Sequence, residues 1–369
     1  MKKWSTKPLG EISELYQPKT ITSAEILSEG PYKVFGANGV IGFYDQYNHE
    51  ESEVAVTCRG ATCGTVNFTE PKSWITGNAM VVTPKDKYLD KRYLFYALKA
   101  SDMATVISGS AQPQITRQSF APMKIPVPPP ADQERIVKLL DEADELRKLR
   151  AQGDRRADAL VPALFHEMFS GGKFKSARVG ELTSLVTSGS TPRGGDEVYT
   201  TEGPYFIRSQ NVQMNRLDLT DAACLPADVH GQMTRTKVSV GDVLLNITGA
   251  SIGRVTWVDK LDREANVSQH VCLIRPKSDL LNSTYLSVFI SLPATQRFIL
   301  QIQSGASRQA LNHKQVRTLE IPLPAMPLQK EFAQRVTEIR ELEASQATSR
   351  TRLDALFQSM LHRAFNGEL

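Results

Sequence analysis

Apolar residues recur every three or four positions in two long segments of the chain, and each segment follows a proline-rich stretch. The segments, 125–171 and 321–367, align without a gap under one constant offset, as Ile125 and Ile321 illustrate (321 − 125 = 196). This periodicity predicts one long amphipathic helix in each segment. Because proline fixes φ and lacks an amide donor, the prolines place the start of the first helix near Ala131.

The two predicted helices keep the same apolar register, which favours an intramolecular helix pair over two unrelated helices on separate cores. The apolar positions expected in this pair are Ile136, Leu139, Leu146, Leu160, Phe332, Ile339, Leu342, Leu353 and Leu356. Because the chain between the helices is long enough for a second globular segment, the second helix is expected to run back along the first. Pro162 replaces the Gln358 of the second copy and should kink or restart the first helix.

The chain before each helix carries shorter, strand-like patterns that also recur. Gly60, Ala61 and Gly64 fall on Gly249, Ala250 and Gly253 under one offset (249 − 60 = 189), each set between two β-rich runs. Such a pattern predicts a hairpin with a tight glycine turn. A buried-looking strand, a proline turn and an amphipathic helix follow in both copies, with Asp90 and Asn282 as candidate helix caps.

These patterns predict a mixed α/β (α+β) fold with two globular domains, two long antiparallel coiled-coil helices and a pseudo-twofold internal repeat. The expected segments are a first domain at 1–130, a helical spacer at 131–170, a second domain at 171–326 and a C-terminal helical spacer at 327–369.

Charge is unevenly distributed along the chain. The net charge is +4, and the two globular segments carry the excess, with 14 basic against 12 acidic residues in 1–130 and 17 against 13 in 171–326. Such an excess is compatible with a local DNA-binding patch without requiring one. The N-terminus lacks the apolar stretch of a signal peptide, and no apolar run is long enough to cross a membrane, so a cytoplasmic protein is expected.

Residue patterns typical of catalysis are missing from the sequence. It has no GxxxxGK[ST] loop and no HExxH motif, and its six histidines are scattered. Cys58 and Cys63 with His49 form the one conceivable metal cluster, but buried, apolar cysteines are the better interpretation. We therefore expect no catalytic residue and no metal ligand in this chain.

Each globular segment ends in a polar, glycine-containing loop, 108–116 or 304–312. Arginine, glutamine and asparagine side chains can pair with base edges in the major groove, although the same residues also occur in ordinary solvent-exposed loops. The candidate DNA-binding residues, chosen from these loops and from the strand turns, are Arg59, Gln112, Gln114, Arg117, Arg208, Asn211, Arg254, Arg308 and Asn312.

Taken in order, these motifs resemble the specificity subunit of type I restriction-modification systems over essentially the full length. The resemblance rests on the IPxPxxxxQ stretches at Ile125–Gln133 and Ile321–Gln329, and on the GATCGTV and GASIGRV turns. The AFNGEL ending at Ala364–Leu369 adds to it. Each motif is weak alone, but their tandem order is specific.

The resemblance implies two target-recognition domains that each read one half of a bipartite double-stranded DNA site. It further implies that the helices set the spacer and dock two modification subunits, with two restriction subunits joining the complex. S-adenosylmethionine, ATP and magnesium would then belong to those partners, and this subunit would be non-catalytic and without a cofactor of its own. The alternatives are a coiled-coil scaffold that binds only protein and a nuclease or transferase acting alone.

Overall fold

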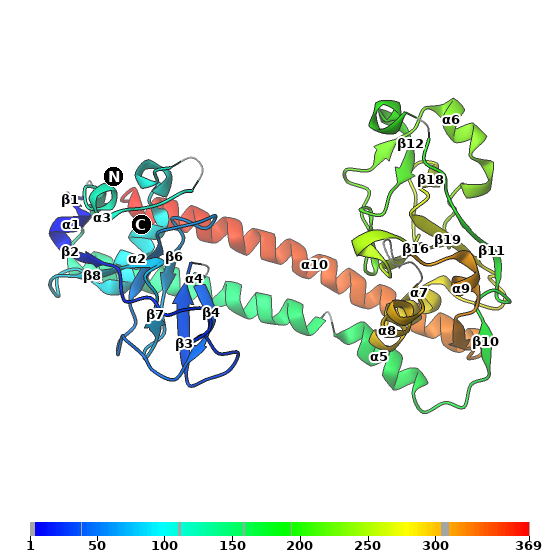
Figure 1. Cartoon of the computed structure of the whole chain (residues 1–369), viewed down its shortest axis with the longest axis horizontal. Coiled ribbons are helices and arrows are strands. Elements are labelled where there is room, and N and C mark those ends of the chain that lie inside the picture. The colour runs from blue at the N-terminus through cyan, green and yellow to red at the C-terminus, as the bar shows by residue number, and fades with distance from the viewer. Residues whose placement is uncertain are drawn as a thin grey trace. The chain divides into compact units, whose positions relative to one another are not determined.

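The computed structural model describes residues 4–37, 39–109, 112–157, 159–192, 194–303 and 310–368. The chain is organised in two units, which are described separately below (Figure 1). Unit 1 comprises Met1–Gln152 and Ala347–Leu369, and unit 2 comprises Gly153–Gln346. The boundary between the units therefore falls inside each of the two long helical segments.

Unit 1 contains two sheets and the helices that cover them. Its elements are β1 (Thr6–Pro8), α1 (Leu9–Ile12), β2 (Ser13–Tyr16), β3 (Tyr32–Gly36), β4 (Gly39–Tyr44), β5 (Val54–Thr57), β6 (Val66–Phe68), β7 (Trp74–Ile75), β8 (Ala79–Pro84), α2 (Lys91–Ala100), the 3₁₀ helix η1 (Met103–Val106), α3 (Arg117–Phe120), β9 (Lys124–Pro126) and the first part of α4 (Pro130–Ala157). A four-stranded antiparallel sheet has the order β2-β8-β5-β6, and a smaller sheet has the order β4-β3-β7. The predicted β5–β6 hairpin is confirmed, and β3 and β4 form a second antiparallel pair joined by a short turn.

The central strands of the larger sheet are buried on both faces, which explains their nearly continuous apolar sequence. Val54 and Val56 belong to the cluster that packs against α2 and the long helices. Ala55 points to the opposite cluster, where it meets Phe35 and Ile75 of the smaller sheet. Alternate residues of one strand thus join two layers of the domain.

Unit 2 repeats this plan with additional elements. They are α5 (Leu160–Phe169), β10 (Ser176–Arg178), β11 (Thr183–Ser188), η2 (Gly195–Val198), β12 (Thr200–Ile207), β13 (Val212–Gln213), β14 (Arg216–Leu217), β15 (Ala223–Cys224), α6 (Ala227–Gln232), η3 (Thr234–Thr236), β16 (Val243–Asn246), η4 (Gly249–Ser251), β17 (Val255–Trp257), β18 (Ala265–Val267), β19 (Val271–Pro276), α7 (Ser283–Ser291), α8 (Pro293–Ile302), α9 (His313–Arg317), β20 (Glu320–Pro322) and the first part of α10 (Met326–Phe365). Its sheets have the orders β11-β19-β16-β17 and β15-β12-β18, which match those of unit 1 strand for strand.

Equivalent hydrogen bonds confirm the internal repeat. The Tyr93 hydroxyl donates to the Pro126 carbonyl at 2.8 Å, and the Tyr285 hydroxyl donates to the Pro322 carbonyl at 2.7 Å. Both predicted caps are also present, since the side chains of Asp90 and Asn282 accept from backbone amides in the first turns of α2 and α7.

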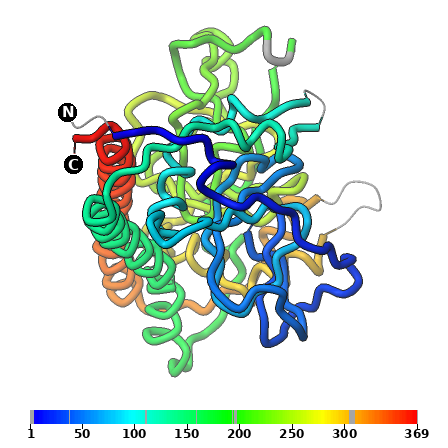
Figure 2. The backbone as a smooth tube through the Cα atoms, turned by 90° about the vertical axis from the view of Figure 1, so that its left-hand side faces the viewer, coloured from blue at the N-terminus to red at the C-terminus, as the bar shows by residue number. Residues whose placement is uncertain are grey.

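The long helices run antiparallel inside each unit. In unit 1 the start of α4 lies beside the end of α10 (Figure 2). Ile136 and Leu140 of α4 share a core there with Phe357 and Leu361 of α10. In unit 2, α5 and the start of α10 share a core in which the Phe165 and Phe332 rings lie 5.5 Å apart. The predicted direction of the helix pair is therefore confirmed within both units. The predicted restart is confirmed too, because α5 begins at Leu160 with Pro162 in its first turn.

The predicted helix-pair residues divide into two groups. Ile136 and Phe332 are fully buried, whereas Leu139, Ile339 and Leu353 are half-buried. Four repeat-equivalent leucines lie outside the packing face, which corrects the predicted seam. They are Leu146, Leu160, Leu342 and Leu356, with exposed fractions of 53%, 43%, 51% and 51%.

The position of Arg147 explains why Leu146 of α4 is exposed although Ile136 is buried. The packing stripe continues from Ile136 and Leu140 to Arg147, whose guanidinium lies 4.5 Å from the centre of the Phe357 ring. Arg147 Nε also donates to Asp354 Oδ1 at 2.7 Å. Because successive helical residues differ by about 100° in direction, Leu146 turns away from this contact and faces solvent.

Within the described ranges, none of the helices combines the length and the apolar character needed to traverse a lipid bilayer.

Candidate nucleic-acid interface

Three loops of unit 1 meet beside the β5–β6 hairpin. The Ala37 carbonyl, in the β3–β4 turn, accepts hydrogen bonds from the hydroxyls of Thr57 (2.8 Å) and Thr62 (2.5 Å). On the other side of the hairpin, the Gly60 amide donates to the Pro113 carbonyl at 3.1 Å. We call the surface formed by residues 36–37, 59–64 and 108–114 the loop surface of unit 1, within the described residues.

Two of the four candidates in unit 1 are neighbours on this loop surface. Arg59 and Gln114 are joined as partners in an antiparallel bridge, and both side chains are exposed. Gln112 is exposed two residues away on the same segment. Arg117 differs, because it is the first residue of α3, where Thr116 forms a capping box. The structure thus groups Arg59, Gln112 and Gln114.

Steric limits on the backbone explain why glycine occupies these positions of the hairpin turn. Gly60 and Gly64 have φ values of 87° and 91°, in the left-handed region that side chains with a Cβ disfavour. Gly253, which is equivalent to Gly64, has a φ of 88°, and a Cβ there would collide with Gln296. The side-chain Nε2 of Gln296, on α8, donates to the Gly253 carbonyl at 2.9 Å and so holds the β16–β17 turn in place.

Unit 2 builds an equivalent frame with different side chains. Thr248 and Ala310 form the bridge that Arg59 and Gln114 form in unit 1. The hydrogen bond beside this bridge is also shared. The Leu311 amide donates to the Ile247 carbonyl at 2.9 Å in unit 2, and the Ile115 amide donates to the Cys58 carbonyl at 3.0 Å in unit 1. The backbone of the two surfaces is therefore shared, whereas their polar side chains differ. The candidate Arg308 lies outside the described residues.

The second unit has an insertion next to this frame. In unit 1, β4 follows β3 after a short turn, whereas in unit 2 the β13–β14 hairpin stands between the partner strands β12 and β15. The candidate Arg254 is exposed in the adjacent β16–β17 turn, and its Nη1 donates to Gln213 Oε1 of this hairpin at 3.1 Å. The candidate Arg208 is half-buried at the base, with its guanidinium 5.2 Å from the Tyr199 ring centre.

Asn211 and Asn312 have structural roles that the sequence did not predict. Asn211 is only 4% exposed; its Oδ1 accepts from the Arg208 amide and its Nδ2 donates to the Asp218 carbonyl, both at 3.0 Å. These bonds close the base of the hairpin, so Asn211 has a structural role, and its contact with a base stays a prediction. Asn312 is exposed, but its Oδ1 accepts from the Gln315 amide at 2.9 Å and caps α9.

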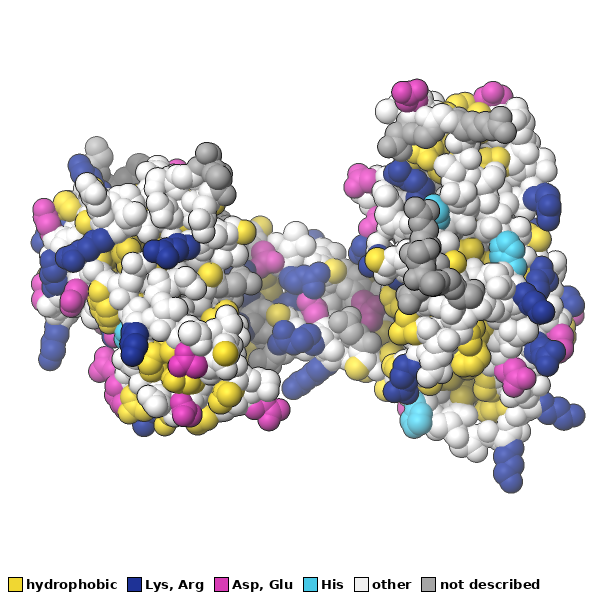
Figure 3. Space-filling model, viewed as in Figure 1, with side chains coloured by type: hydrophobic (Ala, Val, Ile, Leu, Met, Phe, Trp, Pro, Cys, Tyr) yellow, Lys and Arg dark blue, Asp and Glu magenta, His cyan; other side chains and the backbone are white. Residues whose placement is uncertain are grey.

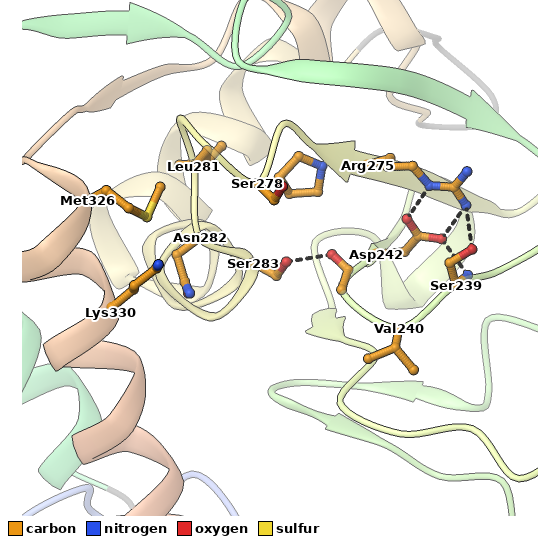
Figure 4. Close-up of a pocket in the computed structure, with 12 residues that line it drawn as sticks. Ser239, Val240, Asp242, Arg275, Ser278, Leu281, Asn282, Ser283, Met326 and Lys330 are labelled. Carbon is orange, nitrogen blue, oxygen red and sulfur yellow. Dashed lines mark hydrogen bonds and ion pairs between the residues drawn. The ribbon is translucent and has the colours of Figure 1, made fainter.

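A cavity of about 360 Å³ in unit 2 lies where the strands, α7 and α10 meet (Figure 4). Asp242 is 1% exposed, and its carboxylate oxygens accept from Nε and Nη2 of Arg275 at 2.7 and 2.8 Å. Glu53, its repeat equivalent (242 − 53 = 189), binds Lys91 at 2.8 Å in unit 1. Because a buried carboxylate must be paired, these ion pairs are structural joints of the domains.

The cysteines and His49 do not form the metal cluster considered above. Cys58 Sγ donates to the Asn78 carbonyl at 3.1 Å, whereas the His49 ring is hydrogen-bonded to the Tyr16 hydroxyl at 2.9 Å. Burial raises the pKa of the Cys58 thiol, and it raises that of Cys272 to about 12. Both thiols therefore stay protonated at neutral pH.

On the face shown in Figure 3, surface charge alone does not mark the interface. Lys and Arg side chains alternate there with Asp and Glu on both units. We therefore identify the candidate surface from the geometry of the loops and not from charge.

Comparison with known proteins identifies the class of the fold. A family model described as the type I restriction modification DNA specificity domain matches residues 1–153 and 227–351. A crystal structure of a type I restriction-modification S subunit from M. genitalium aligns with a TM-score of 0.64 and 15% identity, over 98% of this chain and 96% of that chain. A second structure, from work on complex assembly of the type I R-M system, has a TM-score of 0.59 at 18% identity, covering 99% and 98%.

Sequence relatives agree with this class. The MjaVIII specificity subunit of Methanocaldococcus jannaschii is 20% identical over 338 residues, which cover 86% of this chain and 79% of that protein. The EcoBI specificity subunit of Escherichia coli is 29% identical over 179 residues, covering 47% and 37%. The chain belongs to the family of type I restriction modification DNA specificity domains. The predicted specificity subunit is thus confirmed, and the family membership favours it over the scaffold alternative.

Proposed function

We propose that each unit of this specificity subunit reads one half of a bipartite double-stranded DNA site. The observation that carries this proposal is the shared backbone frame with different side chains, Arg59 and Gln114 in unit 1 against Thr248 and Ala310 in unit 2. Equivalent frames dock on DNA in the same way, whereas different side chains select different bases. Two unlike half-sites are the expected product of this arrangement.

We further propose that the helices dock two modification subunits and determine the length of the spacer between the half-sites. The exposed leucines Leu146, Leu160, Leu342 and Leu356 support docking, because they are apolar side chains left uncovered at repeat-equivalent positions. The equivalence of the positions supports two copies of one partner. Two restriction subunits would complete the assembly.

The chemistry is proposed to belong to those partners. S-adenosylmethionine would serve the modification subunits, and ATP and magnesium would serve the restriction subunits. The present chain would supply recognition and geometry, without a catalytic residue of its own. A cytoplasmic location follows from this role, because the assembly acts on cellular DNA.

The test is co-expression with the modification subunit, followed by single-molecule sequencing of host DNA for methyladenine. The proposal expects a split motif with two short defined halves around a gap of fixed length. Replacing residues 1–130 by the equivalent segment of another family member should then change one half only. A stable complex that methylates no defined motif, or an exchange that changes both halves, would contradict the proposal.

A further inference from the structure

The β13–β14 hairpin of unit 2 is an exposed element with an unusually firm support. Its tip presents Met214, which is 41% exposed, and its flank presents Arg216, whose side chain is 70% exposed. The exposed Arg254 of the neighbouring turn is hydrogen-bonded to Gln213 of the same hairpin. Arg216 is paired with Asp218 at 2.8 Å, so two arginines, one of them ion-paired, and an amide lie together beside the frame that unit 2 shares with the loop surface of unit 1.

The base and floor of the hairpin are fixed by two asparagines. Asn211 closes the base through the two bonds described above. Asn246, which is fully buried on β16, donates from Nδ2 to the Ser209 carbonyl at 2.8 Å and to the Val212 carbonyl at 3.3 Å. Because backbone groups removed from water need hydrogen-bond partners, these two side chains supplement the few bonds that the two-residue strands make with each other.

The turn of the hairpin is held from below by an arginine of the long helix. Asn215 occupies the turn with a φ of 58°, and its amide donates to the Val255 carbonyl at 2.7 Å. Its carbonyl accepts from Nη1 of Arg340, on α10. The Arg340 guanidinium also lies 4.1 Å from the centre of the Trp257 ring on β17, a cation–π geometry that fixes its plane.

The repeat provides an internal comparison for Arg340. The equivalent helix position in unit 1 is Asp144 (340 − 144 = 196), which is paired within its own helix with Arg147 and Lys148 at 3.3 and 3.0 Å. Unit 1 has no strand pair between β3 and β4 in its described part. The supporting arginine thus occurs in the unit that has the hairpin, and an acidic residue stands in the unit that lacks it.

We propose that the β13–β14 hairpin contacts the DNA half-site of unit 2 through Gln213 and Arg216, and that Arg340 is the positioning residue that holds it there. This inference rests on the proposed half-site recognition. A guanidinium can bind phosphate or the edge of guanine, and an amide can read adenine, so the hairpin matches the chemistry of duplex DNA. Arg340 acts through the backbone and does not itself touch the bases.

The experiment uses the complex of the full chain with its modification subunit and duplexes that carry the motif found by methylation sequencing. Binding is measured for the intact site and for sites with one base pair changed in either half. Arg340→Met should lower discrimination at the second half-site roughly tenfold, about 1.4 kcal/mol, while discrimination at the first half-site stays unchanged. A loss of folded protein as a whole would lower both equally, and hydrogen exchange in unit 2 of the variant shows whether that unit stays folded, so positioning is separated from stability.

Matched variants make the result specific. Arg335→Met removes an exposed arginine that pairs with Glu331 on the same helix, and it should leave both half-sites unchanged. Arg340→Lys keeps a cation above Trp257 but loses the planar fork, so it should restore discrimination only in part. Arg216→Ala removes an exposed cation together with its ion pair to Asp218, while the bonds made by Asn211, Asn246 and Arg340 remain, and it should weaken binding of the second half-site.

Each failure has a distinct meaning. If the wild-type complex recognises no split motif, the proposed function is overturned and the inference with it. If the motif exists but Arg340→Met and Arg216→Ala leave discrimination at the second half-site unchanged, half-site recognition stands and the hairpin assignment is overturned.

Discussion

Gln133 and Gln329 offer the sharpest test of how the domains are joined to the long helices. Both are fully buried at the starts of α4 and α10. Gln133 Nε2 donates to the carbonyls of Pro128 and Tyr88, each at 2.9 Å, and its Oε1 accepts from the Asp90 amide at 2.8 Å. Gln329 makes the same three bonds in unit 2, to Pro324, Leu280 and Asn282.

The structure sets the expected size of the effect. In Gln133→Met the side chain keeps a similar volume and loses all three bonds. The Pro128 carbonyl is buried, so leaving it unpaired costs about 1–3 kcal/mol, and each of the two partly buried bonds contributes about 0.5–1.5 kcal/mol. The free energy of unfolding of unit 1 should therefore fall by about 2–6 kcal/mol in total.

Hydrogen exchange with peptide-level mass spectrometry measures the opening of each unit separately. Gln133→Met should speed exchange in unit 1 and Gln329→Met in unit 2. Gln358→Met and Gln334→Met, at exposed positions of α10, are the controls and should change stability by less than about 0.5 kcal/mol. The reasoning is refuted if the buried variants cost no more than their controls, or if each loosens the opposite unit.

Three further predictions concern the helices and one histidine. Lengthening both helices by about four residues should favour a spacer longer by one or two base pairs, since a helical residue rises about 1.5 Å and a base pair about 3.4 Å; methylation sequencing that returns the original spacer would exclude the helices as its determinant. Leu146→Ser together with Leu342→Ser should weaken binding of the modification subunit while leaving the thermal unfolding of the isolated chain nearly unchanged, as titration calorimetry and a melting curve would show; unaltered binding would exclude these leucines from docking. Burial lowers the pKa of His49 from its usual value of 6.5, so the unfolded chain binds the proton more readily than the folded chain. The free energy of unfolding should therefore fall as pH drops below about 6.5, and His49→Gln should flatten this dependence between pH 7.5 and 5.5. If the variant and the wild type show the same slope of stability against pH, His49 is not the group responsible.

The sequence predicted those parts of the fold that depend on local chemistry. The glycine turns at Gly60 and Gly249, the caps Asp90 and Asn282 and the restart at Pro162 each follow from the conformational limits of one residue type. The direction of the helix pair followed from connectivity alone. These features need no knowledge of what packs where.

The sequence could not place side chains whose role depends on distant partners. Leu146 has the helical spacing of a core residue, but Arg147 takes the packing position because Asp354 and Phe357, from the other end of the chain, receive it. Asn211 has the side-chain chemistry of a base-reading residue. Only the folded hairpin shows that its Oδ1 and Nδ2 already form hydrogen bonds within the protein. The support of that hairpin by Arg340 was equally invisible, because the arginine lies on a helix far along the chain.

The division of α10 between the two units has a consequence for synthesis of the chain. Unit 2 is one continuous stretch, Gly153–Gln346, so its residues are all available once that stretch has left the ribosome. Unit 1 precedes unit 2 along the chain, but its core includes Phe357, Leu361 and Ala364, which follow unit 2. Unit 1 can therefore complete its core only after all of unit 2 has been synthesised, and loss of the last turns of α10 would damage unit 1 before unit 2.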